Sequence, residues 1–260
     1  MPACGCLRLS EARRGGYPGR MAAARGSTGR AAAEAARDPE DAYTAEPFVP
    51  RDADLAALRE AAAGCRGCPL HREATQTVFG SGDAAARVML VGEQPGDQED
   101  RQGRPFVGPA GKVLMRALDE AGIDPTETYV TNAVKHFKFG HLPGRGKRRI
   151  HKPPSLREMT ACRPWLAAEL HLIEPEVIVA LGATAGKALL GPSFRVGKQR
   201  GMLLPCPPLD GHGPAPEAEP RECVVATIHP SAVLRADDRE AACQGLVSDL
   251  RVVAEALGGP

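Results

Sequence analysis

The feature that most constrains the fold is a series of short apolar segments, each separated from the next by a stretch with helical character. The first, RVMLVG at residues 87–92, is followed by turn residues, as is typical of a buried strand. Three further segments repeat the pattern: YVTNAVK, VIVALG and CVVATIH. Strands joined by single helices imply right-handed crossovers in a parallel sheet. The sequence therefore predicts an α/β fold, a three-layer sandwich with a central, mostly parallel four-stranded sheet.

Composition agrees with this fold class. Aromatic residues make up only 4% of the chain, so the core must rest on Ala, Val, Leu and Ile, which suits helices packed on a parallel sheet. At 260 residues the chain is long enough for one substantial core, and we expect one compact domain.

Two segments should lie outside that core. Residues 1–50 are rich in Gly, Ala, Arg, Pro and Glu without an apolar period, so we expect a disordered tail, within which Met21 is an alternative start. Residues 205–222 hold too many prolines for a helix or central strand, which predicts a surface insertion. The folded domain then spans residues 51–260.

Neither a membrane span nor a secretion signal is evident. The chain has no run of about 18 apolar residues and lacks an apolar block at its N-terminus. We therefore expect a cytoplasmic protein, whose eight cysteines should stay reduced rather than pair as disulfides. Cys4 and Cys6 have no partner ligands nearby, and Cys206, Cys223 and Cys243 lack a paired spacing, so we assign none of them to a metal.

Charge is distributed unevenly along the chain. The formal net charge is only +1, yet residues 135–152 contain seven Lys or Arg and no Asp or Glu. Such a local patch favours a polyanionic partner, nucleic acid above all. A solvated basic loop without a ligand would give the same pattern, so charge alone leaves the function open.

Polar or special residues follow three of the predicted strands. GEQPGDQED comes after the first strand, residues 132–136 end and follow the second, and HPS at residues 229–231 follows the last. Ligands of open parallel sheets bind at the carboxyl ends of the strands, so these three segments can converge on one crevice. Each alone could serve only to turn the chain, but their joint occurrence indicates a site.

These segments together resemble the uracil-DNA glycosylase superfamily, in particular its iron-sulfur branch, the family-four enzymes, which carry GE-x-PG and a late HPS. The sequence KRRIH at residues 147–151 is similar to that of the UdgX group within this branch. The resemblance covers roughly Leu55 to Leu257 without the proline-rich insertion. It implies a uracil-DNA glycosylase-like fold, uracil-containing DNA as substrate with single strands preferred, a monomer, and a nucleoid-associated role in base excision repair.

A pair of cysteines ends the first predicted helix. Cys65 and Cys68 have the spacing that lets two thiolates bind one metal centre, and two more ligands are needed. The resemblance implies ligands after the second strand and on the next helix, where this chain has His136 and Cys162. It also implies a 4Fe-4S cluster, and imidazole replaces thiolate in Rieske centres. Zinc on the same four ligands remains an alternative, as does a cluster without His136.

The resemblance also assigns residues to a pocket for an extruded base. Phe106 would stack on uracil, or else is a core phenylalanine. Asn132 presents an amide oxygen and an amide nitrogen together, which suits the N3 donor and O4 acceptor of uracil; the alternative is a turn asparagine. Gln94 and Gly96 would line the slot with backbone, and Asp97 is a secondary candidate.

Cleavage of the base–sugar bond develops positive charge on the sugar and negative charge on uracil, so an anion and a donor should flank the bond. By resemblance, Glu93 takes the acidic position and His229 donates to uracil O2. Ser231 would contact a DNA phosphate.

The basic loop at residues 140–154 carries a further histidine, which adds little charge near neutral pH because the ordinary pKa of histidine is about 6.5. Neutral imidazole is a nucleophile, and the resemblance implies that His151 attacks the sugar carbon and leaves the protein joined to DNA. Phosphate contacts would come from Lys147, Arg148, Arg149 and Lys152. Two alternatives stay open, a family-four glycosylase with turnover and a non-catalytic iron-sulfur DNA-binding protein.

Overall fold

The computed structural model describes residues 43–141, 148–205 and 222–258. Residues 1–42 of the predicted tail, Lys147 in the basic loop and residues 206–221 of the proline-rich insertion lie outside the described residues. The folded part begins before the expected boundary at residue 50. Ala45 is 1% exposed, and its N–H donates to the carbonyl of Ala161 at 2.7 Å.

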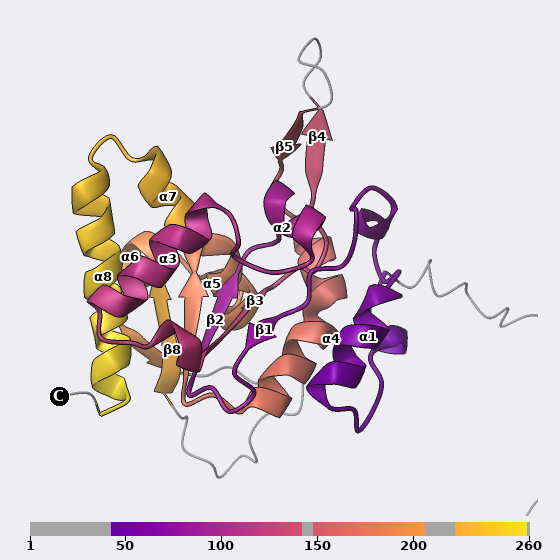
Figure 1. Cartoon of the computed structure of the whole chain (residues 1–260), viewed down its shortest axis with the longest axis horizontal. Helices are drawn as coiled ribbons and strands as arrows, with labels where there is room; N and C mark the ends of the chain where they lie inside the picture. The colour runs from indigo at the N-terminus through magenta and orange to yellow at the C-terminus, as the bar shows by residue number, and fades with distance from the viewer. Residues whose placement is uncertain (1–42, 142–147, 206–221, 259–260) are drawn as a thin grey trace, which may run out of the picture. The chain divides into compact units, whose positions relative to one another are not determined.

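The described residues form a central six-stranded sheet whose middle is parallel (Figure 1). β3, β2, β6 and β8 pair in parallel, and the short edge strands β1 and β7 are antiparallel. The prediction of an α/β fold with a mostly parallel sheet is confirmed, but the strand count of four is too low. β1 and β7 are only two and three residues long, too short to leave an apolar run in the sequence. In spatial order the strands are β1 (Ser81–Gly82), β3 (Thr128–Asn132), β2 (Val88–Gly92), β6 (Val177–Leu181), β8 (Glu222–Thr227) and β7 (Leu203–Pro205).

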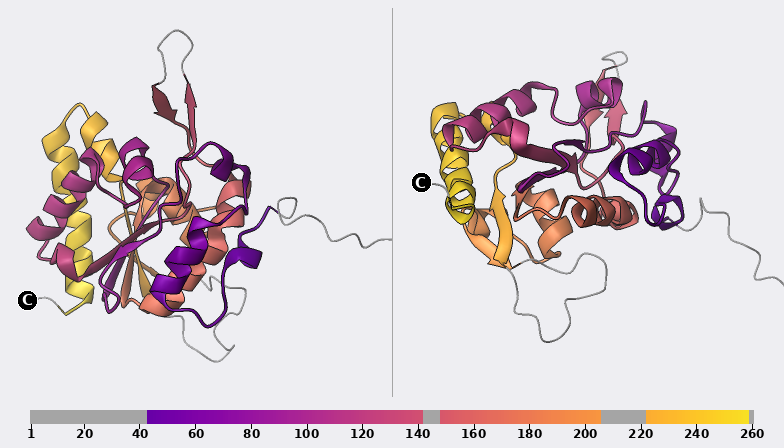
Figure 2. Two further views of the ribbon diagram at one scale, coloured as in Figure 1. Left: turned by 45° about the vertical axis from the view of Figure 1, so that its right-hand side comes forward. Right: turned by 60° about the horizontal axis from the view of Figure 1, so that its bottom comes forward.

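Helices cover both faces of this sheet, as Figures 1 and 2 show. Successive strand residues point to opposite faces, so Leu90 packs with Leu118 and Leu250 in one cluster, whereas Met89 packs in another. The first face is covered by α3 (Pro109–Glu120), α7 (Pro230–Arg235) and α8 (Arg239–Ala256), and the second by α4 (Leu156–Ile173) and α5 (Gly182–Leu190). Burial on both faces explains why the strands read as continuous apolar runs.

A third apolar cluster packs beside the sheet around Trp165, which is fully buried in α4. It joins α4 to η1 (Glu46–Phe48), to α1 (Leu55–Ala63) and to the turn that leads into η2 (Pro69–Arg72). The remaining short helices are α2 (Asp97–Gln102), η3 (Pro125–Glu127) and α6 (Val196–Gln199).

The basic loop is built as a hairpin that stands out from the sheet (Figures 1 and 2). Its strands β4 (Phe139–His141) and β5 (Arg149–His151) are antiparallel and pair Phe139 with His151. His151 is therefore at the base of the hairpin, next to the body of the fold. Among the described residues, no helix combines the length and apolarity that a membrane span requires.

Candidate active site

The predicted site segments meet around a cavity of about 510 Å³ at the carboxyl ends of the strands. Glu99, Ala110 and Arg235 line it although the sequence analysis did not select them. Eight of the predicted catalytic and substrate-binding residues line it as well: Glu93, Gln94, Gly96, Phe106, Asn132, His151, His229 and Ser231.

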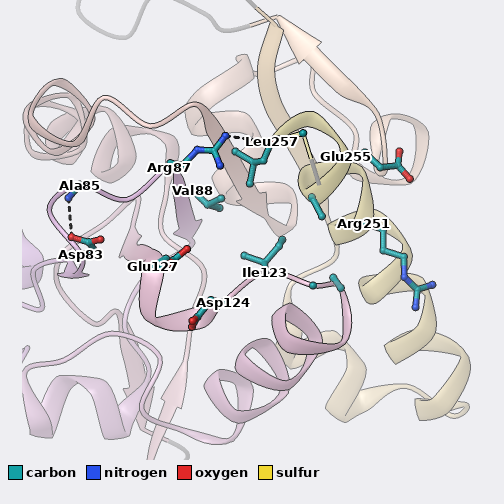
Figure 3. A pocket seen from close by; sticks show the side chains of 14 residues that line it. Asp83, Ala85, Arg87, Val88, Ile123, Asp124, Glu127, Arg251, Glu255 and Leu257 are labelled. Carbon is teal, nitrogen blue, oxygen red and sulfur yellow. Dashed lines mark hydrogen bonds between the residues drawn. The ribbon is translucent and has the colours of Figure 1, made fainter. Parts of the chain in front are cut away.

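A larger cavity of about 700 Å³ lies near the start of β2 and the end of α8 (Figure 3). Its lining includes none of the predicted site residues, and several of its polar groups are already bound within the protein. Arg87 donates to Glu176 and to the carbonyl of Leu257, and Asp83 accepts from the N–H of Ala85. We therefore place the chemistry in the smaller cavity, where titratable side chains converge.

Gly92 makes room for the floor of the cavity. It ends β2 directly opposite Asn132, which ends β3 and is only 2% exposed. A Cβ at Gly92 would lie 2.3 Å from Oδ1 of Asn132 and 2.7 Å from Cζ of Phe106. Only glycine at this position lets the amide and the ring come so close to the end of the strand.

Phe106 is held in a backbone conformation that non-glycine residues rarely adopt, with φ of 54°. Two contacts fix the loop around it. Gly111 of α3 packs so tightly that a Cβ there would lie 1.7 Å from the Phe106 carbonyl oxygen. The Glu99 carboxylate accepts from the N–H groups of Gly96 and Gly108 at 3.1 and 2.9 Å, which ties the GEQPG segment to the Phe106 loop.

His229 is fixed as a neutral donor. Its Nδ1 accepts from the Ser231 N–H at 3.1 Å, and the Ser231 hydroxyl lies 2.8 Å from the same nitrogen. The proton of the neutral ring is therefore on Nε2. Burial, followed by the charges of Arg235 and His151, lowers the pKa of His229 to about 4. Arg235 also donates to the Ser231 hydroxyl at 3.1 Å, so Ser231 is engaged within the protein, and its contact with a DNA phosphate stays a prediction.

Glu93 and His151 meet at the cavity, where the His151 side chain is 47% exposed. Nε2 of His151 lies 3.3 Å from Oε1 of Glu93, and the other carboxylate oxygen accepts from the hydroxyl of Thr184 at the start of α5. Burial lowers the pKa of His151, the Glu93 carboxylate opposes that shift, and Arg235 adds to it. Thr184 follows the end of β6 in LGAT, and this weak strand-end signal did not single it out from the sequence.

Gln94 holds both strands of the hairpin. Its amide nitrogen donates to the carbonyls of Lys138 and Lys152 at 3.1 and 3.0 Å, and its amide oxygen accepts from the Lys138 N–H at 3.1 Å. The sequence analysis expected only backbone lining from Gln94. The side chain instead anchors the base of the hairpin, next to His151.

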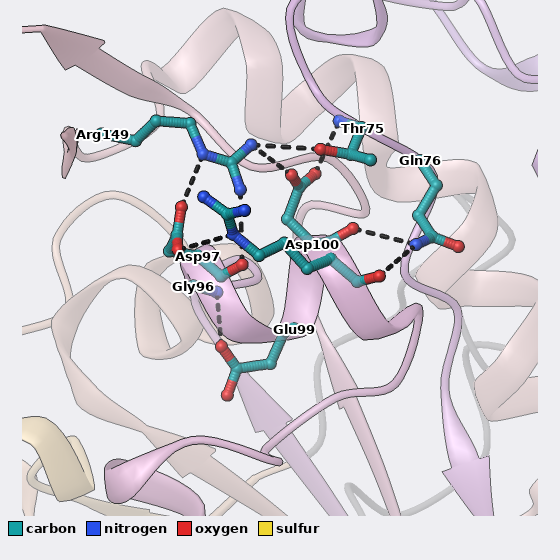
Figure 4. Close-up of polar contacts among 8 residues, drawn as sticks. Thr75, Gln76, Gly96, Asp97, Glu99, Asp100 and Arg149 are labelled. Atoms are coloured by element: carbon teal, nitrogen blue, oxygen red, sulfur yellow. Dashed lines mark hydrogen bonds and ion pairs between the residues drawn. The ribbon is translucent and has the colours of Figure 1, made fainter. Parts of the chain in front are cut away.

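Arg149 and Asp97 differ most from their expected roles (Figure 4). The Arg149 side chain is 10% exposed and forms 2.5 Å contacts with both Asp97 and Asp100, so its charge is neutralised inside the protein rather than offered to DNA. The guanidinium also lies over the rings of Phe137 and Phe139, at 5.4 and 5.0 Å from their centroids. An arginine that bridges two carboxylates and stacks on aromatic rings fixes geometry.

Asp97 thereby serves the hairpin rather than the base slot. Burial would raise the pKa of Asp97, but hydrogen bonds from Arg101 and Arg149 hold it below the ordinary value.

Fewer cations of the basic segment face solvent than the sequence suggests. Lys135 is fully buried, and Lys138 pairs with Glu158 at 2.8 Å. Arg148 and Lys152 are exposed. Arg235 adds a cation at the cavity itself, and its position four residues after Ser231, one helical turn, is the signal that could have revealed it.

Three of the four predicted metal ligands share one buried cluster. Cys65, Cys68 and Cys162 are free thiols that pack around Trp165, whose Nε1 donates to Cys65 Sγ at 3.2 Å. Burial raises the pKa of Cys68 to about 11 and that of Cys162 to about 12. Thiols are the soft ligands that iron-sulfur clusters and zinc use, so the donor chemistry fits either group.

The geometry around the thiols is looser than a closed metal site. Within residues 43–258, apart from the undescribed gaps, no group of three or more His, Cys, Asp or Glu has metal-binding geometry. Burial lowers the pKa of His136 to about 4, and its Nε2 lies 2.9 Å from the Thr77 hydroxyl. Cys243 is half-buried and free, whereas Cys223 is disulfide-bonded, which corrects the expectation that no cysteine would form a disulfide.

Comparisons with known proteins bear on this geometry. A family model described as the uracil DNA glycosylase superfamily matches residues 79–251. The chain is 38% identical over 172 residues to a type-4 uracil-DNA glycosylase of Thermotoga maritima, covering 66% of this chain and 78% of the relative. It is 34% identical over 186 residues to that of Pyrobaculum aerophilum, covering 70% and 85%. A type-5 uracil-DNA glycosylase of the latter organism is 31% identical over 142 residues, with 47% and 58% covered.

Proposed function

This chain belongs to the uracil-DNA glycosylase superfamily, and we propose that it excises uracil from DNA and then becomes joined to the abasic sugar through His151. The observation that carries the proposal is the position of His151. Its ring lines the same cavity as Asn132 and His229, with Nε2 3.3 Å from Oε1 of Glu93. Such a protein corresponds to the UdgX type of the superfamily.

Recognition of the base rests on Asn132 and Phe106. The buried Asn132 amide offers an acceptor and a donor side by side, which matches N3–H and O4 of uracil and mismatches cytosine. The Phe106 ring lies 6.0 Å from the His229 ring, centroid to centroid, so a base that enters the cavity meets an aromatic face and a donor together.

In the cleavage step, His229 and Glu93 stabilise developing charges of opposite sign. The bond between the sugar C1′ and uracil N1 breaks, and uracil leaves with the electron pair. Nε2–H of neutral His229 donates to O2 of the departing anion, whose charge is greatest in the transition state. The Glu93 carboxylate, oriented by Thr184, stabilises the positive charge on C1′.

Capture by His151 completes the reaction. The Nε2 lone pair of the neutral ring forms a bond to C1′, the ring becomes positively charged, and its Nδ1 proton is lost to solvent. Uracil takes up one proton from solvent, so atoms and charge balance. A histidine held beside the sugar competes well with water because its effective concentration is high. The carbon–nitrogen bond has no easy leaving group, so each protein molecule should react once.

A second candidate is a conventional releasing glycosylase. The type-4 relatives favour it, because they are named only for glycosylase activity. The two candidates differ in stoichiometry. Free uracil and covalent adduct, measured with excess uracil-containing DNA, should both reach about one equivalent per protein. Uracil release that continues through many equivalents without adduct would favour turnover. A non-catalytic binder would release no uracil at all.

DNA contacts should come from the cations of the basic loop. Arg148 and Lys152 are exposed, and Lys147 belongs to the same segment of the sequence. Contacts of this kind bind phosphate without reading sequence and weaken as salt rises. We propose single-stranded DNA as the preferred substrate, a monomeric enzyme, and a role in base excision repair at the nucleoid.

We also propose that Cys65, Cys68, Cys162 and His136 hold a 4Fe-4S cluster. When bound, the cluster would supply metal–ligand bonds that cross-link the turn after α1, the helix α4 and the segment after β3. The supporting observation is that the three thiols share one buried cluster in which Trp165 and the backbone N–H of Lys135 donate to sulfur. Iron and acid-labile sulfide analysis of wild type and Cys162→Ser tests this assignment. Iron with sulfide supports it, and zinc without sulfide contradicts it.

A further inference from the structure

Lys135 was counted with the basic patch, but the structure buries it completely beneath the base pocket. An ammonium group has three donors, and all three are used here. Nζ donates to the Thr131 hydroxyl at 2.6 Å, to the backbone carbonyl of Asn132 at 2.8 Å and to Oε2 of Glu169. Two of these acceptors belong to the last two residues of β3, which delivers Asn132 to the cavity.

Glu169 completes the network from α4 and is also fully buried. Besides Lys135, its carboxylate accepts from the Thr131 hydroxyl, from the Tyr129 hydroxyl at 3.1 Å and from the Gly80 N–H at 2.9 Å. The ion pair therefore connects the helix behind the sheet to the end of β3. Every buried side-chain polar atom in the described part of the chain has a partner, these included.

A buried ion pair of this kind is a poor device for stability alone. Removing each charge from water costs several kcal/mol, and apolar replacements of similar shape are often neutral or stabilising. Its presence at the end of β3 therefore points to a geometric task. The one group in the network that adjoins the base pocket is Asn132, whose carbonyl the ammonium holds while its amide faces the cavity.

We propose that Lys135, supported by Glu169, is a positioning residue that fixes Asn132 for reading uracil. The inference rests on the proposed glycosylase function and adds a residue to it. The Lys135 side chain acts through Asn132 and does not touch substrate. Lys135 holds the backbone carbonyl of Asn132, three residues earlier in the chain. The side-chain amide of Asn132 then keeps one orientation, with its oxygen and nitrogen in fixed positions, and discrimination between uracil and cytosine requires such an orientation.

The test removes both charges at once. Lys135→Met with Glu169→Gln leaves no unpaired buried charge and keeps an acceptor for Tyr129 and Gly80. The matched control is Arg87→Met with Glu176→Gln, which removes a pair at the opposite edge of the sheet. Melting temperature, uracil release and inhibition by free uracil are measured for wild type, the double variant and the control.

We expect the double variant to fold and to lose about 10- to 100-fold in both uracil release and affinity for free uracil, the effect of losing about one hydrogen bond to a charged group. Adduct formed per uracil released should be unchanged, because His151 is untouched. The control should match wild type. If the double variant fails to fold, a milder variant replaces it in the test. Thr131→Val removes one acceptor of the Lys135 Nζ and should show the same pattern more weakly.

Three results would overturn the inference. If the wild type is active and the double variant is equally active and equally inhibited by free uracil, Lys135 has no role in recognition of the base. A loss of activity with unchanged affinity for free uracil places its effect elsewhere. A wild type that releases no uracil overturns the proposed function and this inference with it.

Discussion

Nε2 of His151, at the base of the β4–β5 hairpin, lies 3.3 Å from Oε1 of Glu93 at the end of β2. The hairpin thus brings a nucleophile to the carboxylate that faces the sugar in the proposed reaction. The segment that follows β2 holds the hairpin there: Gln94 donates to backbone carbonyls at its base, and Asp97 and Asp100 pair with Arg149 of β5. The geometry of capture therefore depends on residues that neither touch the base nor attack the sugar.

Gly92→Ala should close the base pocket. The added Cβ would lie 2.3 Å from Oδ1 of Asn132 and 2.7 Å from the Phe106 ring. Overpacking of this kind costs about 1 to 3 kcal/mol, so uracil release should fall about 10- to 100-fold. Steady-state uracil release measures the effect. Gly197→Ala is the control, because a Cβ there meets nothing within 4 Å, and a loss of equal size in that variant would refute the steric explanation.

Gln94→Leu should separate excision from capture. The substitution removes three hydrogen bonds that fix the hairpin, each worth about 1 kcal/mol, while Glu93, Asn132 and His229 remain in place. Adduct formed per uracil released should fall about tenfold or more, with a smaller change in uracil release. Gln98→Leu, at an exposed position of α2, should leave the ratio unchanged. An unaltered ratio in Gln94→Leu would mean that the hairpin needs no such anchor.

Arg149→Lys should impair capture without changing the salt dependence of DNA binding. Lysine cannot reproduce the forked contacts to Asp97 and Asp100 or the stacking on Phe137. The adduct yield should drop about tenfold, while the slope of affinity against salt stays as in wild type. Arg148→Gln should leave the adduct yield unchanged and lower the slope of affinity against salt by the equivalent of about one phosphate contact. A reduced slope in Arg149→Lys would place this side chain on DNA after all.

Capture should persist at mildly acidic pH. Its nucleophile is the unprotonated ring, and burial together with Arg235 holds the pKa of His151 below its ordinary value against the opposing effect of Glu93. A lowered pKa moves protonation to lower pH, so the rate should fall with a midpoint below about pH 6.5, the ordinary pKa of histidine.

Arg235→Gln provides the check on that profile. It removes a charge that lowers the pKa of His151, so the midpoint of the rate profile at saturating DNA should move up. Arg239→Gln, at the start of α8, should leave the midpoint where it is. A midpoint that stays fixed or moves down in Arg235→Gln would contradict the account.

The sequence predicted the parallel sheet and the main residues of the cavity because both follow from local signals. Apolar runs mark β2, β3, β6 and β8, and the strand-end rule brings Glu93, Asn132 and His229 to one edge. β1 and β7 were not predicted, because strands of two or three residues are too short to show a periodic pattern of apolar residues.

The roles of charged side chains were less predictable. Lys135 and Arg149 read as surface cations, and only the tertiary structure shows that Glu169, Asp97 and Asp100 come from distant segments to pair with them. Thr184 and Glu99 likewise gain their function from contacts across the fold. The sequence position of a charged residue does not indicate which oppositely charged residue it contacts in the fold.

The most direct test of covalent capture is a denaturing gel of the protein incubated with a single-stranded oligonucleotide that contains one uracil. Wild type should give a band of protein joined to DNA that survives SDS and heat, and His151→Ser should release uracil without that band. Repeated uracil release by wild type with no such band, or an equal band in His151→Ser, would contradict the account.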